Sequence, residues 1–185
     1  MSRLRSASLT CLLAAVLSAA GQPLALSREG AADVLIDQQG RAMPASALSG
    51  HFLLVYFGYT SCPDVCPTAL ATMARALELL GKDGHDVLPL FVTVDPQRDT
   101  VEVIRAYVAN FSPRLIGLTG SAAAVAAAQR AFNVTAHPAA HGAVDHSPML
   151  YFAGPDGKVL RTFHANQTAE EIAGELRAQI RASGS

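Results

Sequence analysis

Apolar positions fall into two kinds of segment that alternate along the chain. Short continuous apolar runs, typical of strands that are buried on both faces, occupy residues 51–57, 87–94 and 115–118. After each run, apolar residues recur at helical spacing, in residues 70–80, 104–111 and 122–132. This order indicates crossover connections between strands, and such connections place neighbouring strands parallel.

The last third of the chain predicts an antiparallel hairpin and a closing helix. Two apolar runs, 149–153 and 158–163, flank the turn signal Gly154-Pro155-Asp156-Gly157. Thr168 and Glu171 have the spacing of a capping box for a final helix, and Ser121 can cap the alanine-rich helix expected over residues 122–132. Residues 34–36 predict a short strand at the other end. The whole pattern predicts an α/β, thioredoxin-like fold, with a mixed central sheet, helices on both faces and an N-terminal strand or hairpin extension.

Two helix starts follow from proline and capping chemistry. Pro67 lacks an amide hydrogen, so we expect a helix to begin near Pro67, with Cys66 close to its N-cap. Because Cys62 and Cys66 each precede a proline, the segment between them should be a tight loop. Asp99 and Glu102 are expected to form the capping pair of the next helix.

The composition favours one compact domain, and the N-terminal segment indicates that it is exported from the cytoplasm. The chain has 185 residues, of which 50% are hydrophobic and 16% charged, so it can bury a core of its own. Arg3 and Arg5 precede an apolar stretch that ends in small residues, so we interpret residues 1–25 as a secretory signal and residues 26–185 as the domain. We expect a periplasmic monomer, with a membrane association only if the signal is retained as an anchor.

The net charge is −1, which leaves no basic patch for nucleic acid. Nucleic acid is therefore not an expected partner.

The candidate chemistry centres on Cys62 and Cys66, which stand at a strand-to-helix corner. Of the three cysteines, Cys11 should leave with the signal. The positive end of a helix dipole stabilises a thiolate, so reactive sulfur is expected at this corner. A structural disulfide would close a very short loop and stabilise little. An exported cysteine pair can form a disulfide, bind a metal, or do each at different times.

Further candidates come from later segments. Asp95 follows the second strand and should border the cysteine loop, either as an acceptor that orients a ligand or as a loop-capping carboxylate. His146 can reach the cysteines if its strand pairs beside the central one. Adjacent strand residues point to opposite faces, so Asp145 has only a supporting role. Pro138 separates His137 from His141, which favours a surface loop there.

Four ordered motifs carry a resemblance over about residues 31–182. They are Phe57-Gly58-Tyr59-Thr60-Ser61-Cys62-Pro63-Asp64-Val65-Cys66-Pro67, Val94-Asp95-Pro96-Gln97-Arg98-Asp99-Thr100, Gly117-Leu118-Thr119-Gly120 and Val144-Asp145-His146-Ser147. With them the chain resembles the Sco/SenC family of copper-binding, thioredoxin-like proteins, which take part in cytochrome c oxidase assembly.

The resemblance implies that Cys62, Cys66 and His146 bind one copper ion, Cu(I) or Cu(II). It also implies that the partner is the copper-site subunit of cytochrome c oxidase or another copper protein. Soft thiolates suit Cu(I), and an added imidazole lets the same site hold Cu(II). Metal binding needs deprotonated cysteines, so a disulfide between them and copper should exclude each other.

Two other functions stay open at this point. A thiol-disulfide oxidoreductase would use one cysteine to attack and the other to resolve, but it needs no histidine, and its usual spacing has two residues between the cysteines. A zinc site lacks a clear fourth protein ligand. We expect a copper chaperone that binds and transfers its metal rather than an enzyme.

Overall fold

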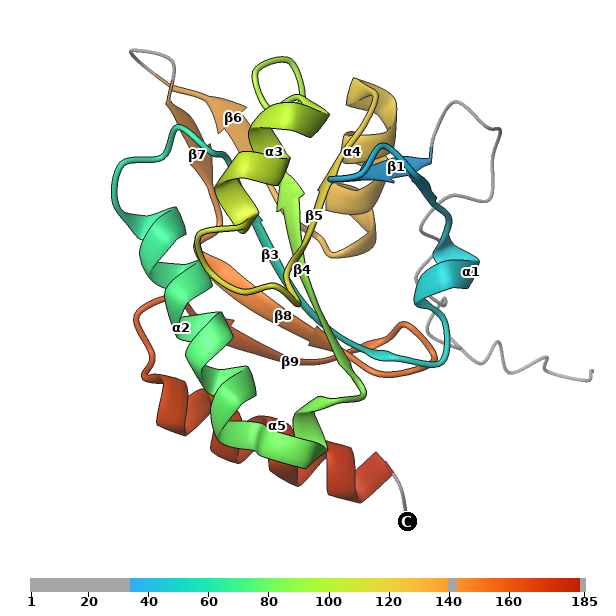
Figure 1. The fold of residues 1–185 in the computed structure, drawn as a ribbon, viewed down its shortest axis with the longest axis vertical. Coiled ribbons are helices and arrows are strands. Elements are labelled where there is room, and N and C mark those ends of the chain that lie inside the picture. Colours follow the sequence, from blue (N-terminus) through green and yellow to red (C-terminus); the bar gives the residue numbers. More distant parts are fainter. Residues whose placement is uncertain (1–33, 140–142, 184–185) are drawn as a thin grey trace, which may run out of the picture.

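The computed structural model describes residues 34–139 and 143–183. One seven-stranded sheet forms its centre, in the order β2-β1-β5-β4-β3-β8-β9 (Figure 1). The strands are β1 (Leu35–Asp37), β2 (Ala42–Met43), β3 (Phe52–Gly58), β4 (Val87–Thr93), β5 (Ile116–Thr119), β8 (Met149–Ala153) and β9 (Val159–His164). The segment predicted as a signal and the predicted loop residue His141 lie outside the described residues.

Strand direction follows the connections. β3, β4 and β5 are parallel and are joined by helical crossovers, whereas β8 and β9 form the antiparallel hairpin that was predicted. β1 pairs antiparallel with both β2 and β5, which makes the N-terminal hairpin extension. Every residue of β3 is buried, because both faces of this strand are covered. The prediction of an α/β fold with a mixed, thioredoxin-like sheet is confirmed.

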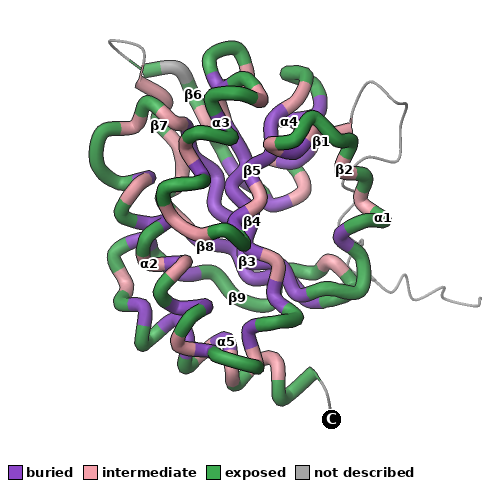
Figure 2. The backbone as a smooth tube through the Cα atoms, viewed as in Figure 1, coloured by how far each residue is buried: buried purple, intermediate pink, exposed green. Residues whose placement is uncertain are grey.

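Helices cover both faces of the sheet. The longer ones are α2 (Val65–Leu80), α3 (Val101–Val108), α4 (Ala122–Ala131) and α5 (Ala169–Ser183), with a four-residue α1 (Ala45–Leu48) and a 3-10 helix η2 (Gly81–Gly84). Buried residues of α2, α3 and α5 share one core cluster, and those of α4 belong to a second cluster on the opposite face. Figure 2 shows the buried positions concentrated along the central strands and the inner sides of these helices.

Capping chemistry placed two helix starts correctly. The Thr168 side chain accepts from the backbone N–H of Glu171, whose carboxylate accepts from the backbone N–H of Thr168, so the capping box of α5 is present. Ser121, the N-cap of α4, accepts from the backbone N–H of Ala124. These local signals work because the partners lie within one turn of each other.

Of two further predicted starts, the one near Pro67 is confirmed to within two residues, and the cap at Asp99 was wrong. α2 begins at Val65 with Asp64 as its N-cap, so Cys66 is its second residue and Pro67 its third. A proline is tolerated there because first-turn amides have no partner inside the helix in any case. α3 is capped by Thr100, and Asp99 is instead drawn into the interior.

The expected loop of histidines is a small β hairpin. β6 (Ala136–Pro138) pairs antiparallel with β7 (Val144–His146), and this two-stranded sheet is separate from the central one. Pro138 is the last residue of β6, and each strand of a two-stranded sheet is an edge strand, where proline is tolerated. His146 is therefore placed by a strand and not by an irregular segment.

Candidate metal centre

A buried aspartate ties together the carboxyl ends of β3, β4 and β5, the first two through its carboxylate and the third through its backbone carbonyl. Asp99 is fully buried and accepts hydrogen bonds from the backbone N–H and hydroxyl of Thr60, at 3.1 and 2.5 Å, and from the hydroxyl of Thr93, at 2.6 Å. The backbone carbonyl oxygen of Asp99 accepts a hydrogen bond from the hydroxyl of Thr119 at 2.7 Å. Thr60 stands two residues before Cys62, so this network fixes the start of the cysteine loop.

The two cysteines differ in exposure. Cys66 is fully buried in the first turn of α2, whereas Cys62 is half-buried in the loop before it, and both are free thiols. The backbone N–H of Cys66 donates to Sγ of Cys62 at 3.4 Å. Gly58, the last residue of β3, makes room for the buried sulfur, because a Cβ added there would lie 3.0 Å from Sγ of Cys66.

β7 brings His146 to the cysteines from 80 residues away. Its Nε2 lies 3.6 Å from Sγ of Cys66. Its Nδ1 lies 3.2 Å from the carbonyl oxygen of Ser147, which can only accept, so Nδ1 carries the hydrogen and Nε2 presents its lone pair to the sulfur. Figure 1 shows β7 beside the loop that leads from β3 into α2.

The surroundings of the two thiols give them different pKa values. Burial raises the pKa of Cys62, but the backbone N–H groups of Asp64, Cys66 and Val65 outweigh it and leave that pKa below its ordinary value. Burial also raises the pKa of Cys66, and the hydrogen bond to Cys62 adds to this, bringing it to about 12. Cys62 is thus the more acidic thiol of the pair, and Cys66 is the thiol that keeps its proton.

His146 is held in the neutral form that binds metals. Burial lowers its pKa, and this outweighs the carbonyl of Ser147 and the charge of Asp145, which both raise it. A neutral imidazole has a lone pair for a cation, and with Nδ1 protonated that lone pair is on Nε2.

The distance between sulfur and nitrogen fits a shared ion. With a metal–sulfur distance of about 2.3 Å and a metal–nitrogen distance of about 2.0 Å, two ligands on one tetrahedral zinc-sized ion lie about 3.5 Å apart. Sγ of Cys66 and Nε2 of His146 are 3.6 Å apart. Across residues 34–139 and 143–183, no three Cys, His, Asp or Glu side chains already surround one point as a closed ligand set. Cys62, Cys66 and His146 are therefore an open set, which an ion would have to draw together.

The two carboxylates predicted to support the site occupy different surroundings. Asp95 pairs with the guanidinium of Arg98, which lies 6.0 Å from the centre of the Tyr59 ring. Tyr59 in turn meets the ring of His146 edge to face. Asp145 is exposed on β7, opposite His137 of β6, and it acts on His146 through its charge. Their roles at a metal site stay predictions.

Sequence reasoning missed several residues that shape the site. Gly58, Tyr56, Tyr59 and Asp99 all contact the cysteine loop or His146. One signal was available for Asp99, since Thr60, Thr93 and Thr119 stand at or just beyond the ends of three neighbouring parallel strands. Polar residues that meet at one sheet edge need a common partner, and a nearby acid can supply it.

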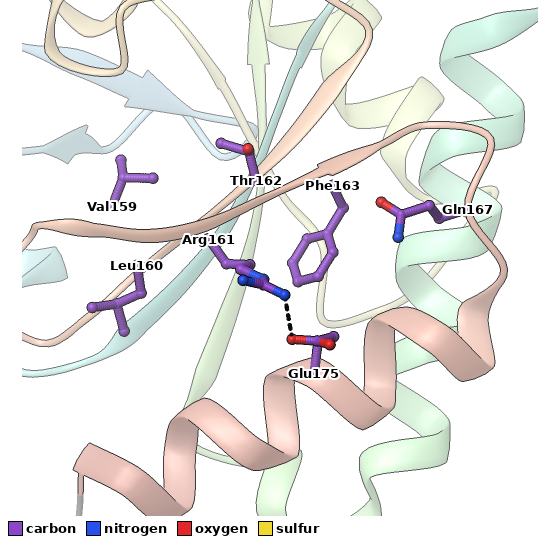
Figure 3. A pocket seen from close by; sticks show the side chains of 7 residues that line it. All are labelled: Val159, Leu160, Arg161, Thr162, Phe163, Gln167 and Glu175. Carbon is purple, nitrogen blue, oxygen red and sulfur yellow. Dashed lines mark ion pairs between the residues drawn. The ribbon is translucent and has the colours of Figure 1, made fainter.

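Two surface hollows are lined by residues other than the three candidate ligands. One of about 430 Å³ lies between β9 and α5, where Arg161 reaches Glu175 in an ion pair of 2.9 Å (Figure 3). Its lining holds no cysteine or histidine. A second hollow, of about 360 Å³, adjoins the cysteine loop and is lined by Asp64, Val65 and Pro148 among others. The described helices include none that is long and apolar enough to span a bilayer.

Comparison with known proteins identifies the family of this chain. A family model described as SCO1/SenC matches residues 24–181. The chain belongs to the SCO1/SenC family. An SCO2-like protein of Rickettsia typhi is 38% identical over 155 residues, covering 80% of this chain and 76% of the relative. The human mitochondrial SCO2 homologue is also 38% identical over 155 residues, which cover 58% of its length.

Solved structures of SCO1/SenC proteins agree in fold. ScoI of Arabidopsis thaliana, solved with copper bound, matches with a TM-score of 0.76 and 34% identity, covering 80% of this chain and 96% of that one. ScoI of Bradyrhizobium japonicum, also with copper bound, gives 0.71 and 38%, covering 78% and 95%. The expected resemblance to the Sco/SenC family is therefore confirmed.

Proposed function

We propose that this SCO1/SenC protein is a copper chaperone that binds one copper ion through Cys62, Cys66 and His146. The observation that carries the proposal is the distance of 3.6 Å between Sγ of Cys66 and Nε2 of His146, from segments 80 residues apart. Two thiolates and an imidazole suit both oxidation states of copper. The copper-bound ScoI relatives support copper as the cargo.

The recipient we propose is the copper-site subunit of cytochrome c oxidase in the periplasm, or another exported copper protein. A carrier must release its ion, and Cys62 is half-buried rather than enclosed, so a recipient thiol can reach the ion from this side. The high pKa of Cys66 also favours release of the ion. Copper must displace the proton of this thiol on binding, and a proton can return to the sulfur when copper leaves.

Copper titration of the two thiol states tests the proposal. In the 185-residue chain carrying Cys11→Ser, the reduced protein should bind one copper ion per chain. The form with a disulfide between Cys62 and Cys66 should bind none, because both thiolates are consumed. Equilibrium dialysis with metal analysis measures both. Equal copper retention by the oxidised form would show that the cysteines are not the ligands.

A thiol-disulfide oxidoreductase is the second candidate, and the unlike thiols favour it. The Cys62 thiolate would attack a partner disulfide to form a mixed disulfide and release one partner thiolate. Cys66 would then lose its proton and displace the second partner sulfur, which leaves a Cys62–Cys66 disulfide and a partner reduced by two electrons. This route does not require a histidine, which is why we rank it second.

We expect little insulin-reductase turnover by the metal-free dithiol protein. The high pKa of Cys66, about 12, makes the resolving thiolate scarce at neutral pH, so the second step should be slow. A turbidity assay of insulin reduction with dithiothreitol measures it, with a dedicated thioredoxin as the positive control. Turnover equal to that of the control would favour the oxidoreductase function over the copper chaperone.

A further inference from the structure

Tyr56 contacts two of the three side chains that we propose as copper ligands. It lies in the middle of β3, and its side chain is fully buried. Its hydroxyl is 3.8 Å from Sγ of Cys66. Its ring meets the ring of His146 at 78°, with the ring centres 6.0 Å apart. The sequence motifs drew no attention to this tyrosine, because it stands within an apolar run.

The direction of the hydrogen bond follows from the chemistry of the two groups. A metal-bound cysteine is a thiolate, which can only accept, so the phenol must donate. A buried hydroxyl needs a partner, and a charged sulfur is a strong one.

We propose that Tyr56 is a positioning residue of the copper site, whose hydroxyl donates to Sγ of Cys66 and whose ring supports His146. This inference rests on the proposed function and adds to it a residue that sets the balance between Cu(I) and Cu(II). The donated hydrogen bond withdraws charge from the sulfur. Sulfur carries more negative charge beside Cu(I) than beside Cu(II), so the hydrogen bond stabilises the Cu(I) form more.

Tyr56→Phe removes the hydroxyl and keeps the ring. In the Cys11→Ser chain, we expect the ratio of Cu(I) to Cu(II) affinity to fall about tenfold, as for the loss of a hydrogen bond to a charged group. The reduction potential should fall accordingly. The sulfur-to-Cu(II) charge-transfer absorption should move to lower energy, because the sulfur electrons are less stabilised. Competition titrations for each oxidation state and visible absorption spectra measure these effects.

Tyr107→Phe is the matched control. Within the described part of the chain, the hydroxyl of Tyr107 is buried and has no hydrogen-bond partner. Its side chain packs against the core cluster that contains Tyr56 and Cys66. The same chemical change should therefore leave the affinity ratio and the absorption energy as in the parent. Equal shifts in both variants would overturn the role of Tyr56.

A second measurement needs no variant. The Cu(I) protein is diamagnetic, so the hydroxyl proton of Tyr56 should appear in proton NMR as a slowly exchanging signal with a nuclear Overhauser effect to the β protons of Cys66. A rapidly exchanging hydroxyl would count against the proposal. A parent chain that binds no copper would overturn the proposed function. A parent that binds copper but does not respond to Tyr56→Phe would overturn only the role of Tyr56.

Discussion

Replacing His146 with alanine should weaken Cu(II) binding at least about 100-fold, while Cu(I) binding falls about tenfold or less. The imidazole is the ligand that suits Cu(II), whereas the two thiolates that remain suit Cu(I). The structure prepares this role, since Nδ1 is hydrogen-bonded to the carbonyl of Ser147 and Nε2 faces Sγ of Cys66 at 3.6 Å. Competition titrations with chelators for each oxidation state measure the two affinities.

The hairpin that carries His146 also supplies the control. His137 of β6 lies opposite Asp145 in the register of the two strands, and it is exposed. His137→Ala removes an imidazole from the same small sheet without touching the sulfurs, so both copper affinities should stay within about twofold of the parent chain. Full-strength Cu(II) binding by His146→Ala would remove His146 from the site, and an equal loss in His137→Ala would assign the effect to the hairpin.

Asp99→Ala should lower the free energy of unfolding by about 3 kcal/mol or more, because it leaves several buried donors without an acceptor. The lost bonds are those to the backbone and hydroxyl of Thr60 and to the hydroxyl of Thr93. Hydrogen bonds to a charged group contribute about 1.5–3 kcal/mol each, although the losses do not simply add. Chemical denaturation followed by circular dichroism measures the change.

A surface carboxylate provides the comparison for Asp99. Glu175 pairs with Arg161 at 2.9 Å, and both side chains are well exposed (Figure 3). Exposed ion pairs contribute little, so Glu175→Ala should cost less than about 1 kcal/mol. Similar losses in the two variants would mean that the buried network is no stronger than a surface pair. A copper titration of Asp99→Ala would further show how far the cysteine loop depends on Thr60 being held.

Local signals in the sequence accounted for much of the fold. The capping box at Thr168 and Glu171 and the N-cap at Ser121 form as predicted, because their partners are adjacent in sequence. The apolar runs located β3, β4 and β5 to within one residue at each end. Such runs are informative because a strand that is covered on both faces must be apolar throughout.

The start of α3 was harder to predict because it depends on distant groups. Asp99 has the right spacing to cap α3, yet Thr60, Thr93 and Thr119 surround it with donors from three strand ends, and Thr100 takes the cap instead. Thr93 lies six residues before Asp99, and Thr119 and Thr60 lie 20 and 39 residues away, so none of these donors stands within one helical turn of Asp99. The local capping rule therefore gave way to a buried network formed from three strand ends.

The sequence by itself determined the family, the order of the strands and helices, and the candidate ligands Cys62, Cys66 and His146. Ordered motifs and apolar periodicity are properties of the sequence, so they can be recognised without coordinates. The tertiary structure alone decided that the imidazole meets the sulfur of Cys66, and that Tyr56 and Gly58 adjoin the same sulfur. These contacts arise where a separate hairpin packs against the strand-to-helix corner, and only the packing of distant elements fixes distances of that kind.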